Sequence, residues 1–403
     1  MTHSAHPTAG GSTKYFFEVT QQVRKLGHHV ALICTDQASS KNIEVDDLLF
    51  VKQIPLPIFA YLAQTMLFGL LAFLKVRGKS FDIYCFESGY MGAWAALFKL
   101  AKRKPVISFS MRYGWNMLKL SLRDRHPARR LGLAYILWEI SFFINEVLDV
   151  RLSDKVIVLS NEGKNVWKDA GLTPAKIKVI PYGVDLEKYR PAEKDQELLE
   201  ELRVGESDNV ILYVGHLDPV RNADKIVEAF PTVLERLRDS EAHANVKLIV
   251  VGSGILETHL KQLVERSGCE EHVRFIPHVY DETKLSRIYN LGDFIVLPQV
   301  PGTVSMAAVA CGLPVVTLQN KTGLLGAVDE RILSTFVLLE SADPQEIASI
   351  CYQLLENPGT LSDISKRGLE LIADYSWQNI SKRLVAFFEE VGMPQLTLPK
   401  ANQ

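Results

Sequence analysis

The clearest pattern in the chain is a regular alternation of short apolar runs and longer amphipathic segments from Asn209 onward. The runs read NVILYVG, VKLIVVG, HVRFIPHV, DFIVLP and PVVTL, and each is followed by a segment whose apolar residues have helical spacing. Continuous apolar strands that alternate with helices are typical of a parallel sheet covered on both faces. We therefore predict an α/β domain over residues 209–375, with helical chain from Pro344 to Val391.

The first half of the chain, residues 1–185, has the same character with less regular spacing. Phe16, Val19, Val23 and Leu26 share one helical face, and Gly27 ends this predicted helix ahead of the strand HVALICT. Further predicted strands read FDIYCF, PVISFS, KVIVLS and IKVIPYGVD. The sequence thus predicts a second α/β domain.

This first domain lacks a clear opening strand. The turn at residues 9–12 should follow a strand in a βαβ unit, but MTHSAHPT supplies at most its last two or three residues. Two explanations stay open. Either the reading frame extends upstream into a Val/Ile-rich strand, or another element takes the place of the first strand.

Two further segments stand out by composition. Residues 186–208 are polar and charged, which predicts a linker between the domains, and residues 376–403 follow the second domain as a C-terminal helix. The stretch Leu56–Leu74 is the most apolar in the chain, but Pro57, Gln64 and Gly69 interrupt it. Its marginal length favours a buried or membrane-surface helix over a spanning one.

Overall composition narrows the class of protein. The 403 residues are 47% hydrophobic, and 45 Lys and Arg face 47 Asp and Glu, which excludes disordered and small disulfide-rich proteins and gives no reason to expect nucleic-acid binding. Five dispersed cysteines and the lack of a secretory signal favour a cytoplasmic location. The sequence contains no Asp-x-Asp, HExxH, Walker, GxGxxG or GxSxG motif, so we expect neither a metal site nor a bound cofactor.

Candidate ligand-binding residues gather where the predicted strands of the second domain end. In parallel sheets, ligands bind beyond the carboxyl ends of the strands. These ends read His216–Arg221, Gly252-Ser253-Gly254, His278–Tyr280 and Pro298–Gly302. Glycines and cations in these places suit an anionic ligand, and ordinary turn residues are the alternative interpretation.

Arg221 is the strongest single candidate. It ends a loop that leaves a strand and precedes the predicted helix Asn222–Leu237. A guanidinium there, together with the helix dipole, would neutralise charge on a departing diphosphate, a role worth about 2–4 kcal/mol. A solvated arginine at a helix N-terminus is the other possibility.

Two further helix starts could bind the same ligand through backbone N–H groups. One follows Gly10 and Gly11, although a double glycine is also a plain tight turn. The other follows Gly302, where a helix capped only for stability is the alternative. The residues of this second helix start are Thr303, Val304 and Ser305.

A local excess of positive charge lies between Lys99 and Arg130, with ten Lys and Arg residues against Asp124 alone. Trp115 and Met117 are among the apolar residues interleaved with these cations, a mixture that suits an anionic bilayer surface or a lipid-linked phosphate. A solvated basic face remains the alternative. The candidate contact residues are Arg112, Lys119, Arg123 and Arg125.

In order and spacing, these segments resemble the group 1 or family-4 retaining glycosyltransferases. The likeness includes PTAGGSTKYFFEVTQQVRKLGHHVALICT, SDKVIVLSNEGKNVWKDAG, KIKVIPYGVDLEKYRP, VGHLDPVRNADKIVEAF, MAAVACGLPVVT and YSWQNISKRLVAFFEEV. The resemblance implies the GT-B fold, which has two facing Rossmann-like domains with parallel sheets and a C-terminal helix that crosses back to the N-terminal domain. It also implies metal-independent, retaining transfer from a nucleotide-diphosphate sugar to a glycan or lipid-linked acceptor, as in polysaccharide biosynthesis.

The resemblance assigns roles residue by residue, and several family residues are replaced here. The family's cationic pair falls on His216 and Arg221, and its Gly-Gly loop falls on Gly10 and Gly11. Its two glutamates fall on Gln299 and Ala307, on either side of a shorter Pro-Gly-x-Val loop that begins at Pro301.

In the N-terminal domain, the family's histidine would fall on Ser110 or Met111. The replacements leave a second hypothesis, a GT-B pseudoenzyme that serves as a binding or partner subunit. A non-hydrolysing sugar-nucleotide epimerase of the same architecture is a third.

Overall fold

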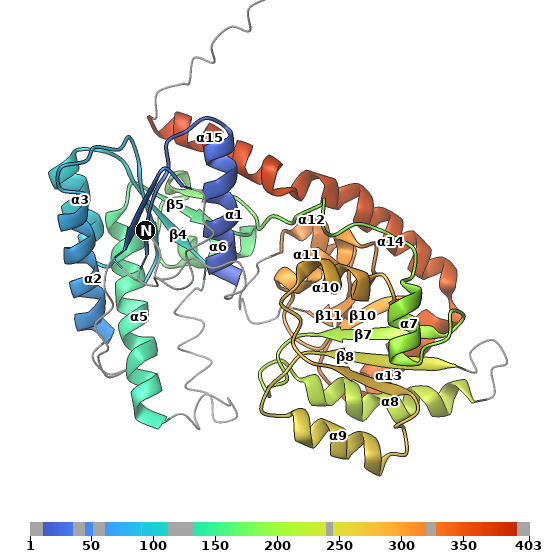
Figure 1. Ribbon diagram of the computed structural model, residues 1–403. Coiled ribbons are helices and arrows are strands. Elements are labelled where there is room, and N and C mark those ends of the chain that lie inside the picture. Colours follow the sequence, from blue (N-terminus) through green and yellow to red (C-terminus); the bar gives the residue numbers. More distant parts are fainter. Residues whose placement is uncertain are drawn as a thin grey trace, which may run out of the picture. The chain divides into compact units, whose positions relative to one another are not determined.

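A computed structural model of the chain describes residues 11–34, 45–50, 61–89, 91–111, 132–238, 245–319 and 328–392. The chain divides into two compact units (Figure 1). The first consists of residues 1–183 and 377–403, and the second of residues 184–321 and 328–376. Both units are α/β, as the sequence predicts.

The second unit contains a sheet of six strands in the order β12-β11-β10-β7-β8-β9, and all neighbouring strands are parallel. Five of them are the apolar runs predicted from the sequence, and β12 is an addition. The first strand, β7, lies inside the sheet between β8 and β10, which is the Rossmann order. The strands are β7 (Asn209–Val214), β8 (Val246–Val251), β9 (Val273–Ile276), β10 (Phe294–Leu297), β11 (Val315–Leu318) and β12 (Val337–Leu339).

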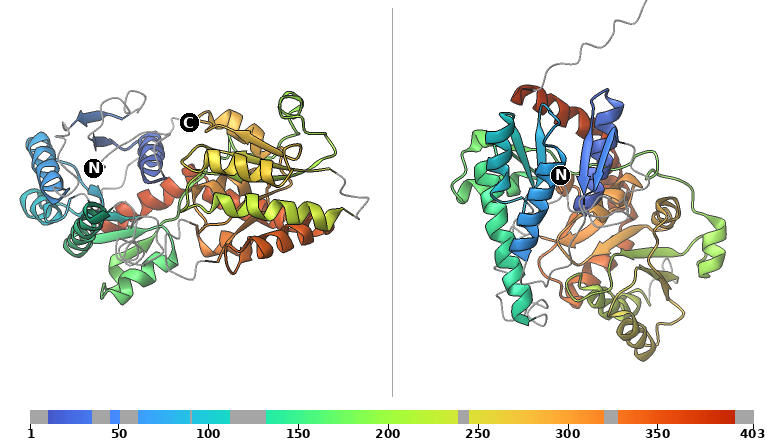
Figure 2. Two further views of the ribbon diagram at one scale, coloured as in Figure 1. Left: turned by 90° about the horizontal axis from the view of Figure 1, so that it is seen from below. Right: turned by 60° about the vertical axis from the view of Figure 1, so that its left-hand side comes forward.

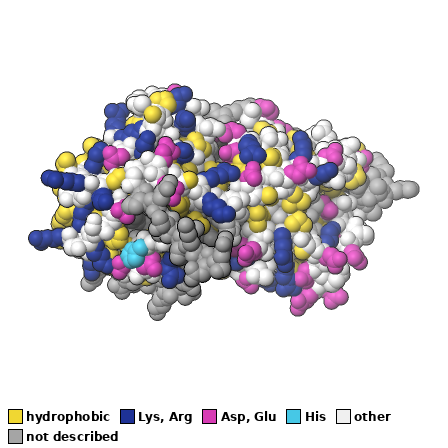
Figure 3. Space-filling view, turned by 90° about the horizontal axis from the view of Figure 1, so that it is seen from above, with side chains coloured by type: hydrophobic (Ala, Val, Ile, Leu, Met, Phe, Trp, Pro, Cys, Tyr) yellow, Lys and Arg dark blue, Asp and Glu magenta, His cyan; other side chains and the backbone are white. Residues whose placement is uncertain are grey.

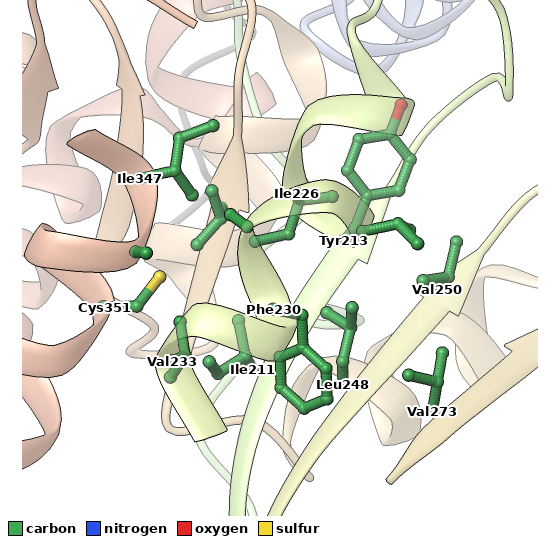
Figure 4. Close-up of a cluster of buried hydrophobic side chains, with 14 of the residues drawn as sticks. Ile211, Tyr213, Ile226, Phe230, Val233, Leu248, Val250, Val273, Ile347 and Cys351 are labelled. Carbon is green, nitrogen blue, oxygen red and sulfur yellow. The ribbon is translucent and has the colours of Figure 1, made fainter. Parts of the chain in front are cut away.

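The helices of this unit cover the sheet and bury a continuous apolar core. Figure 4 shows side chains from β7, β8, α8 and α13 meeting there, with Phe230 of α8 near Leu248. Phe230 is 1% exposed, and burying a side chain of this size stabilises the fold by about 1.5–3 kcal/mol. The helices are α8 (Ala223–Leu237), α9 (Glu257–Arg266), α10 (Glu282–Tyr289), α11 (Thr303–Ala310), α12 (Glu330–Leu333), α13 (Pro344–Glu356) and α14 (Pro358–Ile372), followed by the short 3-10 helix η5 (Ala373–Tyr375).

The segment predicted as a linker, residues 186–208, is folded as part of the second unit. It contains helix α7 (Gln196–Leu202), whose Leu198, Leu199 and Leu202 are buried. Asp195 caps this helix and also pairs with Arg287 of α10. The charged residues of α7 therefore lie on the exposed side of the helix, and its three buried leucines pack it against the rest of the unit.

The first unit has two parallel sheets, one of two strands and one of four, in the orders β1-β2 and β3-β4-β5-β6. The sequence predicts all of these strands except β2, which is a short addition. The right-hand view of Figure 2 shows the two dark blue strands set apart from the lighter blue β3. The strands are β1 (Ala31–Cys34), β2 (Asp47–Phe50), β3 (Tyr84–Glu87), β4 (Val106–Ser110), β5 (Lys155–Val158) and β6 (Ile177–Val179).

The C-terminal helix returns to the first unit, as the family resemblance implies. Helix α15 (Trp377–Val391) packs on α1 (Gly11–Lys25), and the Trp377 ring contacts the rings of Tyr15 and Tyr182 at centroid distances of 5.6 and 4.9 Å. Gly183 permits this packing, because a Cβ there would lie 2.5 Å from the Trp377 ring. The other helices of the unit are α2 (Tyr61–Lys75), α3 (Trp94–Lys102), α5 (Gly132–Leu152), α6 (Asn161–Asp169) and the 3-10 helix η3 (Pro174–Lys176).

The apolar stretch at residues 56–74 forms most of α2. Phe68 and Ala72 of this helix are buried, whereas Met66, Leu70 and Leu74 are between 40% and 52% exposed. Within the described ranges, no helix combines the length and the apolar character needed to cross a bilayer.

Candidate functional site

In the second unit, the loops that follow β7 and β8 are joined by backbone hydrogen bonds. The amide of Gly215 donates to the Val251 carbonyl at 3.0 Å, and the amide of Leu217 donates to the Ser253 carbonyl at 3.1 Å. These loops leave the carboxyl ends of neighbouring parallel strands, where ligands of such sheets bind.

Gly252 and Gly254 allow this close approach of the two loops. A Cβ at Gly252 would lie 1.9 Å from the Gly215 carbonyl oxygen, and one at Gly254 would lie 2.3 Å from the Leu217 carbonyl oxygen. Gly252 also has a φ of +149°, which residues other than glycine rarely adopt. The structure therefore gives both glycines a packing role, and their contact with a donor substrate stays a prediction.

Arg221 and Gln299, which the sequence analysis proposes as site residues, lie in direct contact. The Arg221 guanidinium donates a hydrogen bond of 2.9 Å from Nη1 to Gln299 Oε1. Gln299 is only 7% exposed, and its main-chain carbonyl oxygen accepts hydrogen bonds from the Thr317 hydroxyl at 2.6 Å and the Leu318 amide at 3.1 Å. A buried, well-held glutamine thus orients an exposed guanidinium.

Asn222 ties the loop after β7 to the loop after β10. It adopts a φ of +51°, and its Nδ2 donates to the Pro298 carbonyl at 2.6 Å. The main-chain amide of the preceding residue, Arg221, donates to Asp218 Oδ1 at 2.9 Å. Sequence reasoning takes Asn222 only as a helix start, although asparagine is among the residues that best tolerate this backbone conformation.

Helix α11 begins beside Gln299 in the same loop. Its N-cap, Gly302, donates its amide to Ser305 Oγ at 3.3 Å, and the Ser305 amide donates to the Gly302 carbonyl at 3.1 Å. Because the first N–H groups of a helix have no partner within it, those of Thr303 and Val304 can bind an anion. A Cβ at Gly302 would meet nothing within 4 Å, so the space beside this residue is open.

Ala307 lies one turn farther along α11, and its side chain is almost wholly buried at 8% exposure. A methyl group offers no hydrogen bond to a ligand. Only the backbone of Ala307 could therefore form a hydrogen bond with a donor substrate. The donor-binding role of this position stays a prediction.

His216 belongs to an aromatic cluster at the ends of β7 and β9. Its ring stacks on His278 at a centroid distance of 5.9 Å, and His278 contacts Tyr280 edge-on at 4.4 Å. The sequence places all three residues at strand ends but gives no sign that their rings meet. The catalytic role assigned to His216 stays a prediction.

Tyr213 supports the His216 loop from within the sheet. Its hydroxyl donates to the His216 carbonyl at 3.0 Å. Burial raises the pKa of Tyr213 well above its usual range, although the nearby Arg221 charge opposes the shift. The hydroxyl therefore keeps its proton and its hydrogen bond at every physiological pH.

The predicted residues of the first unit are only partly described. Gly10 and the four basic residues Arg112, Lys119, Arg123 and Arg125 lie outside the described residues, and helix α1 begins at Gly11. Ser110, one of the two positions expected for the family's histidine, is fully buried. It donates to Glu146 Oε1 and accepts from Trp167 Nε1, both at 2.8 Å.

Family comparisons cover both units. Residues 194–370 match the family described as Glycosyl transferases group 1, and residues 9–188 match Glycosyltransferase Family 4. A D-inositol 3-phosphate glycosyltransferase 2 of Catenulispora acidiphila is 30% identical over 239 residues, which are 57% of this chain and 54% of the relative. A D-inositol 3-phosphate glycosyltransferase of Mycobacterium marinum is 30% identical over 255 residues, or 61% and 52% of the two chains. The chain thus spans about half the length of the curated relatives it matches.

Solved structures resemble the chain over nearly its whole length. HepE of Anabaena in complex with UDP has a TM-score of 0.72 at 16% identity, covering 96% of this chain and 99% of that chain. WaaG, a glycosyltransferase involved in lipopolysaccharide biosynthesis, has a TM-score of 0.67 at 14% identity with the same coverage. These likenesses show the fold. The chain belongs to the group 1 and family-4 glycosyltransferases and has the GT-B fold.

Proposed function

We propose that this protein is a retaining glycosyltransferase that moves a sugar from a nucleotide-diphosphate sugar to a glycan or lipid-linked acceptor. The observation that carries the proposal is the Arg221 guanidinium held by Gln299 beside the start of α11. Positive charge and available N–H groups together match the two negative phosphates of such a donor.

The proposed chemistry breaks the bond between the anomeric carbon and the diphosphate. Negative charge grows on the leaving phosphate oxygen in the transition state, while the sugar becomes oxocarbenium-like. Arg221 and the positive end of α11 stabilise that charge, and one such contact is worth about 2.7–4 kcal/mol. In this scheme Arg221 and the positive end of α11 neutralise the negative charge of the diphosphate, and a metal ion is not required.

The replaced glutamates bear on donor affinity. The family resemblance assigns the second glutamate to the ribose of the nucleotide, and Ala307 cannot make that hydrogen bond. A charge-assisted hydrogen bond of this kind contributes about 1.5–3 kcal/mol, so we propose weaker donor binding than in relatives that keep the glutamate.

The nucleotide that we propose is a uridine diphosphate. HepE, which shares the fold, is described in complex with UDP and with UDP-glucose. The low identity transfers no specificity, so the donor must be identified by measurement.

For the acceptor, we propose a lipid-linked glycan at the inner face of a membrane. Support comes from exposed apolar side chains on three helices of the first unit, one of which also carries the exposed Lys75 in its last turn. Figure 3 shows hydrophobic and basic side chains interspersed on the left-hand part of the molecule. Such a mixture favours an anionic lipid surface. The exposed residues are Met66, Leu70 and Leu74 on α2, Leu97 and Leu100 on α3, and Leu137, Ile140 and Ile144 on α5.

Donor binding and turnover test the proposal. Calorimetric titration with UDP, GDP and ADP identifies the nucleotide, and chromatography of the matching sugar nucleotides measures hydrolysis or transfer. We expect Arg221→Ala to lower turnover about 100- to 1,000-fold. The unfolding temperature should stay unchanged, because the side chain is exposed. Lys225→Ala is the matched control, since Lys225 lies on the same helix start but pairs with Asp224 and Glu228.

Two results would contradict the proposal. Equal turnover in the wild type and Arg221→Ala would remove the site assignment. Failure of every nucleotide and sugar nucleotide to bind would favour the pseudoenzyme alternative. Proton NMR of the product reports the anomeric configuration, and an inverted product would exclude the retaining mechanism.

A further inference from the structure

Two histidine rings lie side by side at the carboxyl ends of β7 and β9, although β8 lies between these two strands in the sheet. The rings of His216 and His278 are nearly parallel, with an interplanar angle of 12° and centroids 5.9 Å apart. Ser253, in the loop after β8, bonds to both sides of this contact. Its carbonyl accepts from the Leu217 amide and its hydroxyl from the His278 amide, each at 3.1 Å. These hydrogen bonds hold the two exposed histidines together as a pair.

The histidine pair belongs to the same loop system as Arg221. His216 and Arg221 both lie in the segment that joins β7 to α8. The Tyr213 hydroxyl connects them, because it donates to the His216 carbonyl at 3.0 Å and is near enough to the Arg221 charge for that charge to oppose the rise in the Tyr213 pKa. An anion bound by Arg221 therefore places negative charge near the histidine pair.

Fixed positive charge is scarce around the pair. The segment after β7 carries Asp218 and Arg221, the segment after β8 has no charged residue, and the segment after β9 carries Asp281 beside Tyr280. In the helices that follow, Lys225 of α8 pairs with Asp224 and Glu228, Glu257 of α9 with Lys261, and Glu282 of α10 with Lys188, while His259 and Lys284 lie farther along α9 and α10. Arg221 is thus the one fixed cation of the three strand-end segments.

A nucleoside diphosphate needs more positive charge than Arg221 supplies. Its two phosphates carry about three negative charges near neutral pH, because the last ionisation of a terminal phosphate has a pKa of about 6. Histidine is the side chain whose charge changes near neutral pH, and nearby negative charge favours its protonated form. Two positive rings 5.9 Å apart would repel each other, which limits the pair to one added proton.

We propose that the donor diphosphate binds together with one proton, which the His216–His278 pair takes up from the solvent to form a second positive group beside Arg221. The inference rests on the proposed function, since it takes a nucleotide-diphosphate sugar as the donor. It gives His278 a donor-binding role and makes donor affinity fall as the pH rises. A complex that holds one more proton than its free components loses stability as protons become scarce.

Calorimetric titration of the full chain with UDP in several buffers measures this proton. At pH 7.5, where UDP itself is almost fully ionised, the binding enthalpy varies with the ionisation enthalpy of the buffer, and the slope is the number of protons taken up. We expect the wild type to take up at least about 0.5 proton, and its UDP dissociation constant to rise at least about threefold between pH 7.5 and 8.5.

Variants assign the proton to the histidine pair. The double variant His216→Phe/His278→Phe keeps a ring at each position but removes both imidazoles. It should abolish proton uptake and weaken UDP binding about tenfold at pH 7.5. His259→Phe replaces an exposed histidine of α9 outside the pair, so it is the matched control and should leave both quantities unchanged. Unfolding temperatures check that each variant folds.

NMR of the histidine rings in the wild type provides a second measurement that needs no folded double variant. When UDP binds at pH 7.5, the ring signals of His216 and His278 should move toward their protonated positions, and the His259 signal should stay in place. Unmoved His216 and His278 signals at saturating UDP would contradict the inference.

The calorimetric outcomes separate this inference from the proposed function. UDP binding without proton uptake would overturn the inference and leave the proposed function intact. Proton uptake that persists in the double variant would also overturn it, because another group would then carry the proton. Absence of UDP binding would contradict the proposed function and this inference with it.

Discussion

The contact between Arg221 and Gln299 gives the sharpest prediction. Gln299→Ala removes the side-chain oxygen that accepts the 2.9 Å hydrogen bond from Arg221 and leaves the main-chain bonds to Thr317 and Leu318 in place. A hydrogen bond to a charged group contributes about 1.5–3 kcal/mol. Because Arg221 is exposed, we expect the lower end, which corresponds to about a tenfold loss in kcat/KM.

Removal of the Arg221 guanidinium itself should lower kcat/KM further than Gln299→Ala does. Loss of one group that stabilises transition-state charge typically lowers the rate about 100- to 1,000-fold. If Gln299 acts only by orienting Arg221, it has nothing to orient in the Arg221→Ala variant. The double variant should therefore be as active as Arg221→Ala alone, because the two effects are not additive for residues in contact.

The assay is a double-mutant cycle in kcat/KM with the donor identified by titration, together with the UDP dissociation constant of each variant. Unfolding temperatures provide the control for folding. If Gln299→Ala lowers kcat/KM tenfold in both backgrounds, Gln299 acts independently of Arg221, and the reasoning about orientation is wrong.

Three further predictions concern glycines and a cysteine. Gly302→Ala should leave the unfolding temperature unchanged, since a Cβ there meets nothing within 4 Å, but should weaken UDP binding about tenfold if a phosphate approaches this backbone. Gly359→Ala, whose Cβ would also lie in open space, is the control variant. Equal UDP affinity in the two variants would show that no phosphate approaches the Gly302 backbone. Gly252→Ala should lower the free energy of unfolding by more than about 3 kcal/mol in urea titrations, because its Cβ would lie 1.9 Å from a carbonyl oxygen; an unchanged midpoint would show that the loops yield easily. Burial raises the pKa of Cys351 to about 12, so iodoacetamide at pH 8 should label this cysteine only after unfolding, and rapid labelling of the native protein would contradict its burial.

Sequence patterns predict the second unit well because its strands are buried on both faces. Runs such as NVILYVG are continuous and apolar, and the structure confirms five of them as strands. The same continuity locates the strand ends and thereby Arg221 and Gln299. Neither residue's orientation could be predicted, since the contact joins loops that lie 78 positions apart in the chain.

Features that depend on tertiary packing could not be predicted from the sequence. Residues 186–208 look like a linker because charged residues outnumber apolar ones, yet three leucines suffice to bury one face of α7. Strands β2 and β12 lie at the ends of their sheets and are only partly buried, so they lack the long continuous apolar run of an inner strand such as β7. The stacking of His216 on His278 likewise depends on neighbouring strand ends that are distant in sequence.

A crystal structure of the protein with bound UDP tests the central claim most directly. The account predicts that the β-phosphate lies within about 3 Å of the Arg221 guanidinium and of a backbone N–H at the start of α11. A diphosphate bound away from both groups, or an Arg221 side chain turned from the ligand, would contradict it.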